Sequence, residues 1–262
     1  MSSLGVLITT CAVGGVLVGS FLNVVAWRLP RGESVLRPAS RCPRCGHAIR
    51  ARDNVPVIGW ILLRGRCRDC SARISPRYPA VEAVTGLTFG LIAWRLGFDW
   101  ALPAFLYLSG VGIALALIDF DTRRLPNSLT LPSYLIGGGL LTAAGLLDGQ
   151  PQLLLHAAIG MAVLYALYFV LMIAKPGGMG FGDVKLAGVV GLYLGYLGWG
   201  PLAVGAFAAF LLGGLVGAGL LLFGEARRKT KIPFGPYMVV GALVAVLAGS
   251  ELAHLYVHAV GG

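Results

Sequence analysis

Residues 110–132 read GVGIALALIDFDTRRLPNSLTLP. A long apolar run ends at Asp119, a short polar segment follows, and a second apolar run begins near residue 129. Runs of this kind form membrane-spanning helices, and the polar segment with Pro126 and Pro132 predicts a turn at the membrane surface. A carboxylate at the edge of hydrocarbon is costly, which makes Asp119 a candidate functional residue.

A second carboxylate, Asp183, occupies a similar position in residues 175–195, which read KPGGMGFGDVKLAGVVGLYLG. The glycines before it, including Gly180 and Gly182, give the backbone conformational freedom and let a substrate strand approach closely. A purely structural alternative is that Asp183 caps the helix that follows it. Lys185 is expected to be a charge that keeps this segment on the cytoplasmic side.

The whole chain has the composition of a multi-span membrane protein. It is 57% hydrophobic and 12% charged, with a mean hydropathy of +0.80. Its apolar stretches predict about eight transmembrane helices, with seven as the alternative because one stretch is short for a span. The stretches are 4–27, 79–96, 101–118, 129–147, 152–174, 186–199 (the short one), 201–224 and 236–257.

Basic residues are distributed unevenly along this pattern. With the N-terminus outside and eight spans, every Lys and Arg except Arg95 falls in a segment on the cytoplasmic side. These segments are 28–78, 119–128, 175–185 and 225–235. The positive-inside rule therefore predicts that Asp119 and Asp183 both face the cytoplasm.

Segment 28–78 carries most of the net charge of +10. A basic segment beside the bilayer is expected to contact anionic lipids. Because the segment is tethered to membrane helices at both ends, we expect no nucleic-acid partner.

The same segment contains two CxxC pairs. They are Cys42 with Cys45 and Cys67 with Cys70. Two such pairs can supply four thiolates to a tetrahedral zinc ion, and a cytoplasmic location disfavours the alternative of disulfides. His47 and Cys11 are expected to be bystanders. The expected fold class is therefore an all-α polytopic membrane protein with a small cytoplasmic zinc-binding loop domain.

Asp121 competes with Asp119 for the candidate site. If the helix continues through both residues, they point about 200° apart, so only one faces the helix bundle. Asp119 lies nearer the hydrocarbon, whereas Asp121 is placed to pair with Arg123 or Arg124 at the surface.

Two carboxylates that meet share a proton, so one can act as a base toward water and the other as an acid toward a carbonyl oxygen. This chemistry is peptide hydrolysis of the aspartic-protease kind, and the sequence contains no GxSxG or HExxH motif. A transporter or ion relay that uses intramembrane carboxylates is an alternative of a different class. A zinc-bearing scaffold without catalysis is a third.

Five segments, taken in order, resemble the motifs of the bacterial type IV prepilin peptidases, which are GxGD-type aspartic membrane proteases. They are GSFLNVVAWRLPRG at 19–32, the paired CxxC loop, IDFDTRRLPNSLTLP at 118–132, GMGFGDVKLAGVVG at 178–191 and IPFGPYM at 232–238. The expected domains are a first transmembrane helix at 1–27, a cytoplasmic zinc-binding loop at 28–78 that forms part of a methyltransferase region, and a polytopic peptidase domain at 79–262.

The resemblance implies that Asp119 and Asp183 are catalytic. It also implies cleavage of the basic leader of type IV prepilins and type II secretion pseudopilins, at the cytoplasmic side of the bacterial inner membrane. S-adenosylmethionine would then methylate the new N-terminal amine, and a peptidase without methyl transfer is the alternative.

The resemblance does not locate the methyltransferase residues, and no Rossmann-type GxGxxG motif follows a predicted strand. Asn23 and Glu82 are candidates for this role. Asn23 is equally suited to an interhelical hydrogen bond, and Glu82 to a pairing with Arg77.

Overall fold

The computed structural model describes residues 2–175, 177–223 and 233–260. In these ranges the regular secondary structure is helical, and the only β pairing consists of two isolated bridges within the cysteine loop. The chain forms two compact units, Met1–Gly97 and Phe98–Gly262. The all-helical fold class predicted from the sequence is confirmed.

In the first unit two long helices, α1 (Ser3–Arg28) and α3 (Arg77–Leu96), pack against each other, and the cysteine loop connects them in sequence. The loop adds the short helices η1 (Leu29–Arg31), η2 (Ala51–Asp53) and α2 (Ile58–Leu62). Glycines bring the long helices together, because a Cβ at Gly15 would lie 2.8 Å from Phe89 and a Cβ at Gly19 would lie 2.8 Å from the Glu82 Cα.

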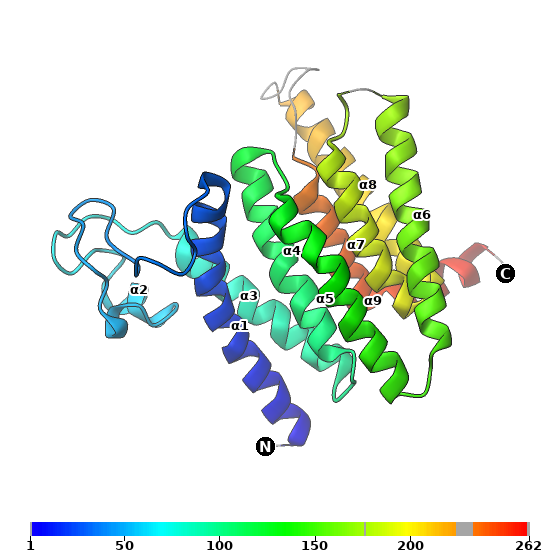
Figure 1. Cartoon of the computed structure of the whole chain (residues 1–262), viewed down its shortest axis with the longest axis horizontal. Coiled ribbons are helices and arrows are strands. Elements are labelled where there is room, and N and C mark those ends of the chain that lie inside the picture. The colour runs from blue at the N-terminus through cyan, green and yellow to red at the C-terminus, as the bar shows by residue number, and fades with distance from the viewer. Residues whose placement is uncertain (1, 176, 224–232, 261–262) are drawn as a thin grey trace. The chain divides into compact units, whose positions relative to one another are not determined.

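In the residues that the structure describes, the second unit is a bundle of six helices (Figure 1). They are α4 (Leu102–Thr122), α5 (Asn127–Leu147), α6 (Gln152–Ala174), α7 (Phe181–Leu197), α8 (Trp199–Leu222) and α9 (Gly235–Val260). Helix α7 is the core of the bundle: it packs against α5, α6, α8 and α9, and from Leu186 to Tyr196 every residue is buried.

Helices α6 and α7 approach one another at the level of the backbone. A Cβ at Gly160 would lie 2.6 Å from the Gly191 carbonyl oxygen, and a Cβ at Gly195 would lie 2.5 Å from the His156 carbonyl oxygen. Small residues at such positions replace the side-chain packing that a wider helix pair would use.

Each of the eight apolar stretches in the sequence coincides with a helix, α1 or one of α3 to α9. Within the described ranges, six of these helices are long and apolar enough to cross a membrane, which supports a membrane protein. Helix α3 carries Arg77, Glu82 and Arg95, and α7 has 17 residues. A helix of that length rises about 25 Å. The count of eight spans therefore remains a proposal for α3 and α7.

The structure does not test two of the expectations from the sequence, namely the position of a basic cluster near residue 230 and the domain limits. The basic cluster from Arg227 to Lys231 lies outside the described residues. The expected domain limits followed the loop, 28–78, and began the polytopic part at residue 79. The compact units divide after residue 97, because α3 packs tightly against α1, and the expected domain limits stay a proposal.

We expect Gly160→Ala to destabilise the bundle by about 1–3 kcal/mol, because the added methyl group forces the α6 and α7 backbones apart. Gly139→Ala is the matched control, since a Cβ at that exposed position of α5 meets nothing within 4 Å. Thermal unfolding in detergent micelles measures both. Equal unfolding temperatures for the two variants would contradict the close packing of α6 and α7.

Candidate functional site

Asp119 lies near the C-terminal end of α4 and is only 5% exposed. Its Oδ2 accepts a hydrogen bond of 3.0 Å from the backbone N–H of Gly235, the first residue of α9. Asp121 is exposed, as the helical separation of the two aspartates predicts. The buried member of the pair therefore faces the bundle, and α4 ends in a left-handed residue, Arg123, four positions later.

Asp183 is in the first turn of α7, three residues after the N-cap Gly180. Its Oδ2 accepts a hydrogen bond of 2.9 Å from the Gly180 N–H, and its own N–H donates to the Gly180 carbonyl oxygen. The carboxylate thus helps to cap α7, although from the third helical position. The Asp183 carboxylate is also near enough to Asp119 for their charges to influence each other.

Gly180 and Gly182, the two glycines nearest Asp183, act through their size, whereas Gly177 has a positive φ of 80°. Gly180 has φ −86°, an ordinary extended conformation, so the expected need for unusual backbone freedom does not apply there. At Gly182 a Cβ would lie 3.0 Å from the Leu125 Cβ. The turn after Asp119 therefore packs directly against the turn that carries Asp183.

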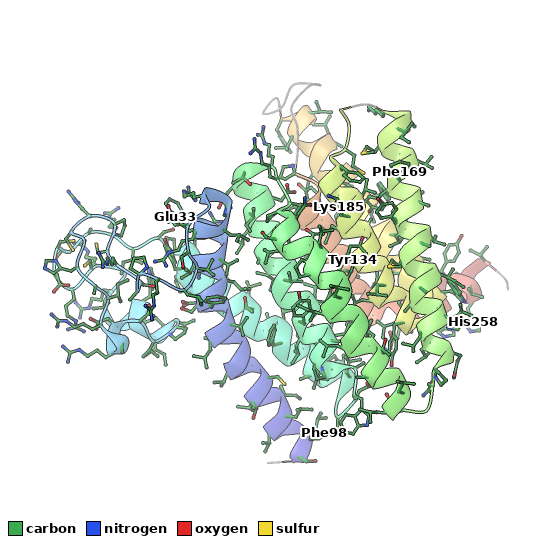
Figure 2. The ribbon with its side chains drawn as sticks, in the orientation of Figure 1. Glu33, Phe98, Tyr134, Phe169, Lys185 and His258 are labelled. Carbon is green, nitrogen blue, oxygen red and sulfur yellow. The ribbon has the colours of Figure 1, made fainter. Side chains whose placement is uncertain are left out.

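Lys185 joins the two aspartate-bearing segments. Its Nζ donates a hydrogen bond of 2.9 Å to Asn127 Oδ1, and its carbonyl oxygen accepts one of 2.6 Å from the Tyr134 hydroxyl. Figure 2 labels Tyr134 and Lys185 on the neighbouring helices α5 and α7. The sequence suggested only a topological charge at Lys185, and nothing in its local pattern indicates a partner 58 residues away.

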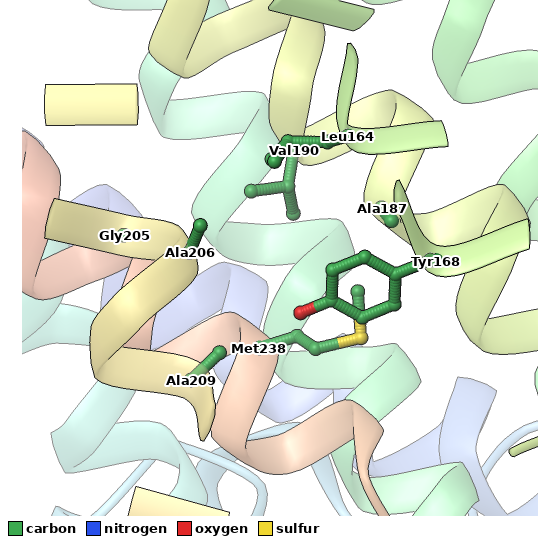
Figure 3. Close-up of a pocket in the computed structure, with 8 residues that line it drawn as sticks. All are labelled: Leu164, Tyr168, Ala187, Val190, Gly205, Ala206, Ala209 and Met238. Atoms are coloured by element: carbon green, nitrogen blue, oxygen red, sulfur yellow. The ribbon is translucent and has the colours of Figure 1, made fainter. Parts of the chain in front are cut away.

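Aromatic rings gather on the α6, α8 and α9 side of the site. The Phe234 ring lies 5.4 Å from that of Phe210 and 6.1 Å from that of Tyr168, measured between ring centroids. Figure 3 shows a narrow apolar pocket beside Tyr168, lined by residues of α6, α7, α8 and α9. Phe234 directly precedes Gly235, whose N–H binds Asp119, so this aromatic cluster lies beside the start of α9 that contacts Asp119.

The four loop cysteines form the second candidate site. Their sulfur atoms all lie within 4.8 Å of one another. Each pair lies in a similar hydrogen-bonded turn, in which Cys42 N–H donates to the His47 carbonyl and Cys67 N–H donates to the Ala72 carbonyl. The backbone N–H of Cys45, followed by that of Arg44, lowers the pKa of the Cys42 thiol to about 6, which favours a thiolate.

This geometry fits a metal ion and not disulfides. The Cys42 and Cys70 sulfur atoms are 3.8 Å apart, far beyond an S–S bond, and all the cysteines are free. Four sulfurs this close, in two knuckle-like turns, can surround one ion. His47 is not in the group and Cys11 lies in α1, as expected of bystanders.

Two further contacts join segments of the cysteine loop that are distant in sequence. Asp53 forms a bidentate ion pair with Arg68, with a shortest distance of 2.6 Å. Hydrogen bonding to Arg68 lowers the pKa of the Asp53 carboxyl group. The Trp60 Nε1 donates to the Ile74 carbonyl.

Asn23 and Glu82, the sequence candidates for methyl transfer, are buried in the first unit. The Asn23 amide donates to the carbonyl oxygens of Gly19 and Tyr78. Glu82 Oε2 accepts a 2.7 Å hydrogen bond from the N–H of Val57, which has a positive φ of 61°. Asn23 therefore ties α1 to the start of α3, and Glu82 ties α3 to the middle of the loop.

Fold and sites together define a polytopic helical membrane protein with a cluster of four cysteines that could hold a metal ion. Two family models match it in tandem: the bacterial peptidase A24 N-terminal domain over residues 13–96 and the type IV leader peptidase family over residues 105–218. The boundary between the matches coincides with the division between the compact units. The chain belongs to the type IV leader peptidase family.

Relatives of nearly the same length support this assignment. The prepilin leader peptidase/N-methyltransferase of Stutzerimonas stutzeri is 36% identical over 94% of this chain and 92% of its own. The proteins of the same name from Aeromonas hydrophila and Neisseria gonorrhoeae are 38% and 36% identical, over 92% and 96% of this chain and 90% and 96% of their own. No solved structure matches the chain.

The cysteine site predicts that the purified protein contains about one divalent metal ion per chain, because four thiolates complete a tetrahedral shell. Cys67→Ser should lose most of this metal, whereas Cys11→Ser should keep it because Cys11 lies in α1. Elemental analysis of protein washed free of loose metal measures the stoichiometry. An unchanged metal content in Cys67→Ser would refute the site.

Proposed function

We propose that this protein is a membrane aspartic endopeptidase that removes the basic leader of type IV prepilins and pseudopilins and then methylates the new N-terminal amine. Membership of the type IV leader peptidase family and the printed names of the full-length relatives support both activities. The observation that carries the peptidase is the buried Asp119 within electrostatic range of Asp183. Nothing in the comparisons supports the transporter or ion-relay alternative.

The proposed peptidase chemistry uses the two carboxylates as one unit. Because two neighbouring carboxylates repel each other when both are ionised, we expect Asp119 and Asp183 to share one proton during catalysis. The ionised carboxylate takes a proton from a water molecule, whose oxygen attacks the scissile carbonyl carbon. The protonated carboxyl group gives its proton to the carbonyl oxygen, and the resulting tetrahedral intermediate collapses as the leaving amine is protonated.

We place this chemistry at the cytoplasmic face of the bacterial inner membrane, with the N-terminus outside. The confinement of almost all Lys and Arg to one set of segments supports this orientation. A prepilin presents its apolar helix in the bilayer beside a basic leader, which suits carboxylates at the ends of membrane helices. The strongly basic segment 28–78 would repel the leader, so that segment is assigned to anionic lipids instead.

Methyl transfer is assigned to the first unit, which matches the N-terminal family domain. S-adenosylmethionine would supply the methyl group, and the protein has to hold a neutral amine in line with it, which is chiefly a positioning task. Asn23 and Glu82 remain the proposed positions. Their hydrogen bonds to Tyr78 and Val57 fix the start of α3 against α1 and the middle of the loop against α3.

Zinc is the metal proposed for Cys42, Cys45, Cys67 and Cys70. Thiolate ligands in a closed set of four are typical of structural zinc sites. The loop between the pairs has little hydrophobic core, so the ion would contribute much of its folding free energy. In this proposal zinc organises the first unit and takes no part in peptide hydrolysis.

Asp119→Asn and Asp183→Asn should each lower the cleavage rate of a prepilin by at least about a hundredfold, because an amide cannot act as the acid or the base. Asp121→Asn is the matched control and should retain cleavage, since Asp121 is exposed. Gel-shift assays with purified enzyme and prepilin in lipid measure the rate. Full cleavage by either of the first two variants would rule out the mechanism.

The methyltransferase proposal predicts that the mature N-terminus gains one methyl group when S-adenosylmethionine is present. Mass spectrometry of the cleaved pilin detects the mass increase. Asp119→Asn should still methylate a peptide that is supplied already cleaved, because the two activities use different units. If the wild-type enzyme leaves the new N-terminal amine unmodified although S-adenosylmethionine is present, the protein is a peptidase without methyltransferase activity.

A further inference from the structure

Gly235 makes a contact that the proposed mechanism does not yet use. It is the first residue of α9, and its backbone N–H donates a buried hydrogen bond of 3.0 Å to Asp119 Oδ2. The two residues are 116 positions apart in the chain. Helix α9 therefore begins directly against the carboxylate at the end of α4.

The contact requires a residue without a side chain. A Cβ at position 235 would lie 2.8 Å from Asp119 Oδ2 and 3.3 Å from its Cγ. The nearest atom is thus the carboxylate oxygen itself, so a methyl group and the present position of the carboxylate exclude one another. Size, rather than unusual backbone freedom, makes glycine necessary here.

Aromatic packing holds the Gly235 amide in place. The preceding Phe234 ring packs against Phe210 and Tyr168, with ring centroids 5.4 and 6.1 Å away. A Cβ at Gly213 of α8 would lie 2.9 Å from the Phe234 ring, so α8 also limits how far that ring can move. The start of α9 is consequently anchored from α6 and α8, and its N–H is a fixed donor.

The two carboxylates are thereby held in related ways. Asp183 accepts the N–H of Gly180 at the start of its own helix, whereas Asp119 accepts the N–H at the start of a different helix. A backbone donor at a helix N-terminus stabilises a carboxylate and fixes its orientation. With Oδ2 engaged in this way, Oδ1 is the Asp119 oxygen that remains to accept a proton from water.

We propose that Gly235 is a positioning residue of the peptidase site. Its N–H orients the Asp119 carboxylate, and the absence of a side chain at Gly235 leaves the space that this carboxylate occupies. This inference rests on the proposed function, since it gives Asp119 a role in hydrolysis. It adds a third chain segment, the start of α9, to the two that carry the aspartates.

The first test compares Gly235→Ala with Gly214→Ala, a control on α8 where a Cβ meets nothing within 4 Å. Gly235→Ala should lower kcat for prepilin cleavage by at least about tenfold with KM nearly unchanged, because the carboxylate is displaced while substrate binding is not. It should also unfold in detergent micelles at the wild-type temperature, which shows that the helix bundle is folded. Gly214→Ala should match wild type in all three measurements.

The second test examines the hydrogen bond without altering Gly235. In Asp119→Ala the acceptor is gone, so amide hydrogen exchange at Gly235 should become at least about tenfold faster. Exchange at Gly180, whose N–H is bonded to Asp183, should not change and serves as the internal control. If Gly235→Ala is unable to fold, this exchange measurement alone tests whether the Gly235 N–H holds the Asp119 carboxylate.

The outcomes separate the two proposals. Cleavage by Asp119→Asn would overturn the proposed function itself. An inactive Asp119→Asn combined with a wild-type kcat in Gly235→Ala would overturn only the positioning role. Unchanged exchange at Gly235 in Asp119→Ala would overturn it as well.

Discussion

The structure depends on one helix, α7, whose neighbours have to reach its backbone directly. Gly160 on α6 meets Gly191 and Gly195 with almost no side-chain volume between them. Lipid tails are as apolar as the side chains of the bundle, so close van der Waals contact has to supply the association that the hydrophobic effect supplies in water. The same tight fit sets where the first turn of α7 lies, and that turn carries Asp183.

A second constraint follows from burying carboxylates among apolar helices. Each of the two aspartates is given a backbone N–H from the start of a helix, and no Lys or Arg is among their hydrogen-bond donors in the described part of the chain. A donor of this kind stabilises a carboxylate without adding a full countercharge, which would hold the pair permanently ionised. The arrangement suits two groups that have to exchange a proton.

The sequence predicted those features of the fold and of the sites that depend on residues close together in the chain. Apolar runs located the eight long helices of the described residues, and the two CxxC pairs located the four sulfur atoms that the fold brings together. The choice of Asp119 over Asp121 as the buried residue needed only helical geometry. Pairings across the bundle could not be read in this way, because they depend on which helices become neighbours.

Three such pairings had no local signal. The Lys185 bond to Asn127, the Gly235 bond to Asp119 and the Glu82 bond to Val57 each join residues separated by dozens of positions. The pairing with the largest separation, between Gly235 and Asp119, has a consequence for how the protein is made. The donor to Asp119 lies in the last long helix of the chain, so a ribosome must add 116 residues after that aspartate before its carboxylate has its partner. A half-made protein in the membrane therefore holds both aspartates but an unfinished site, and it gains its full arrangement only when α9 inserts.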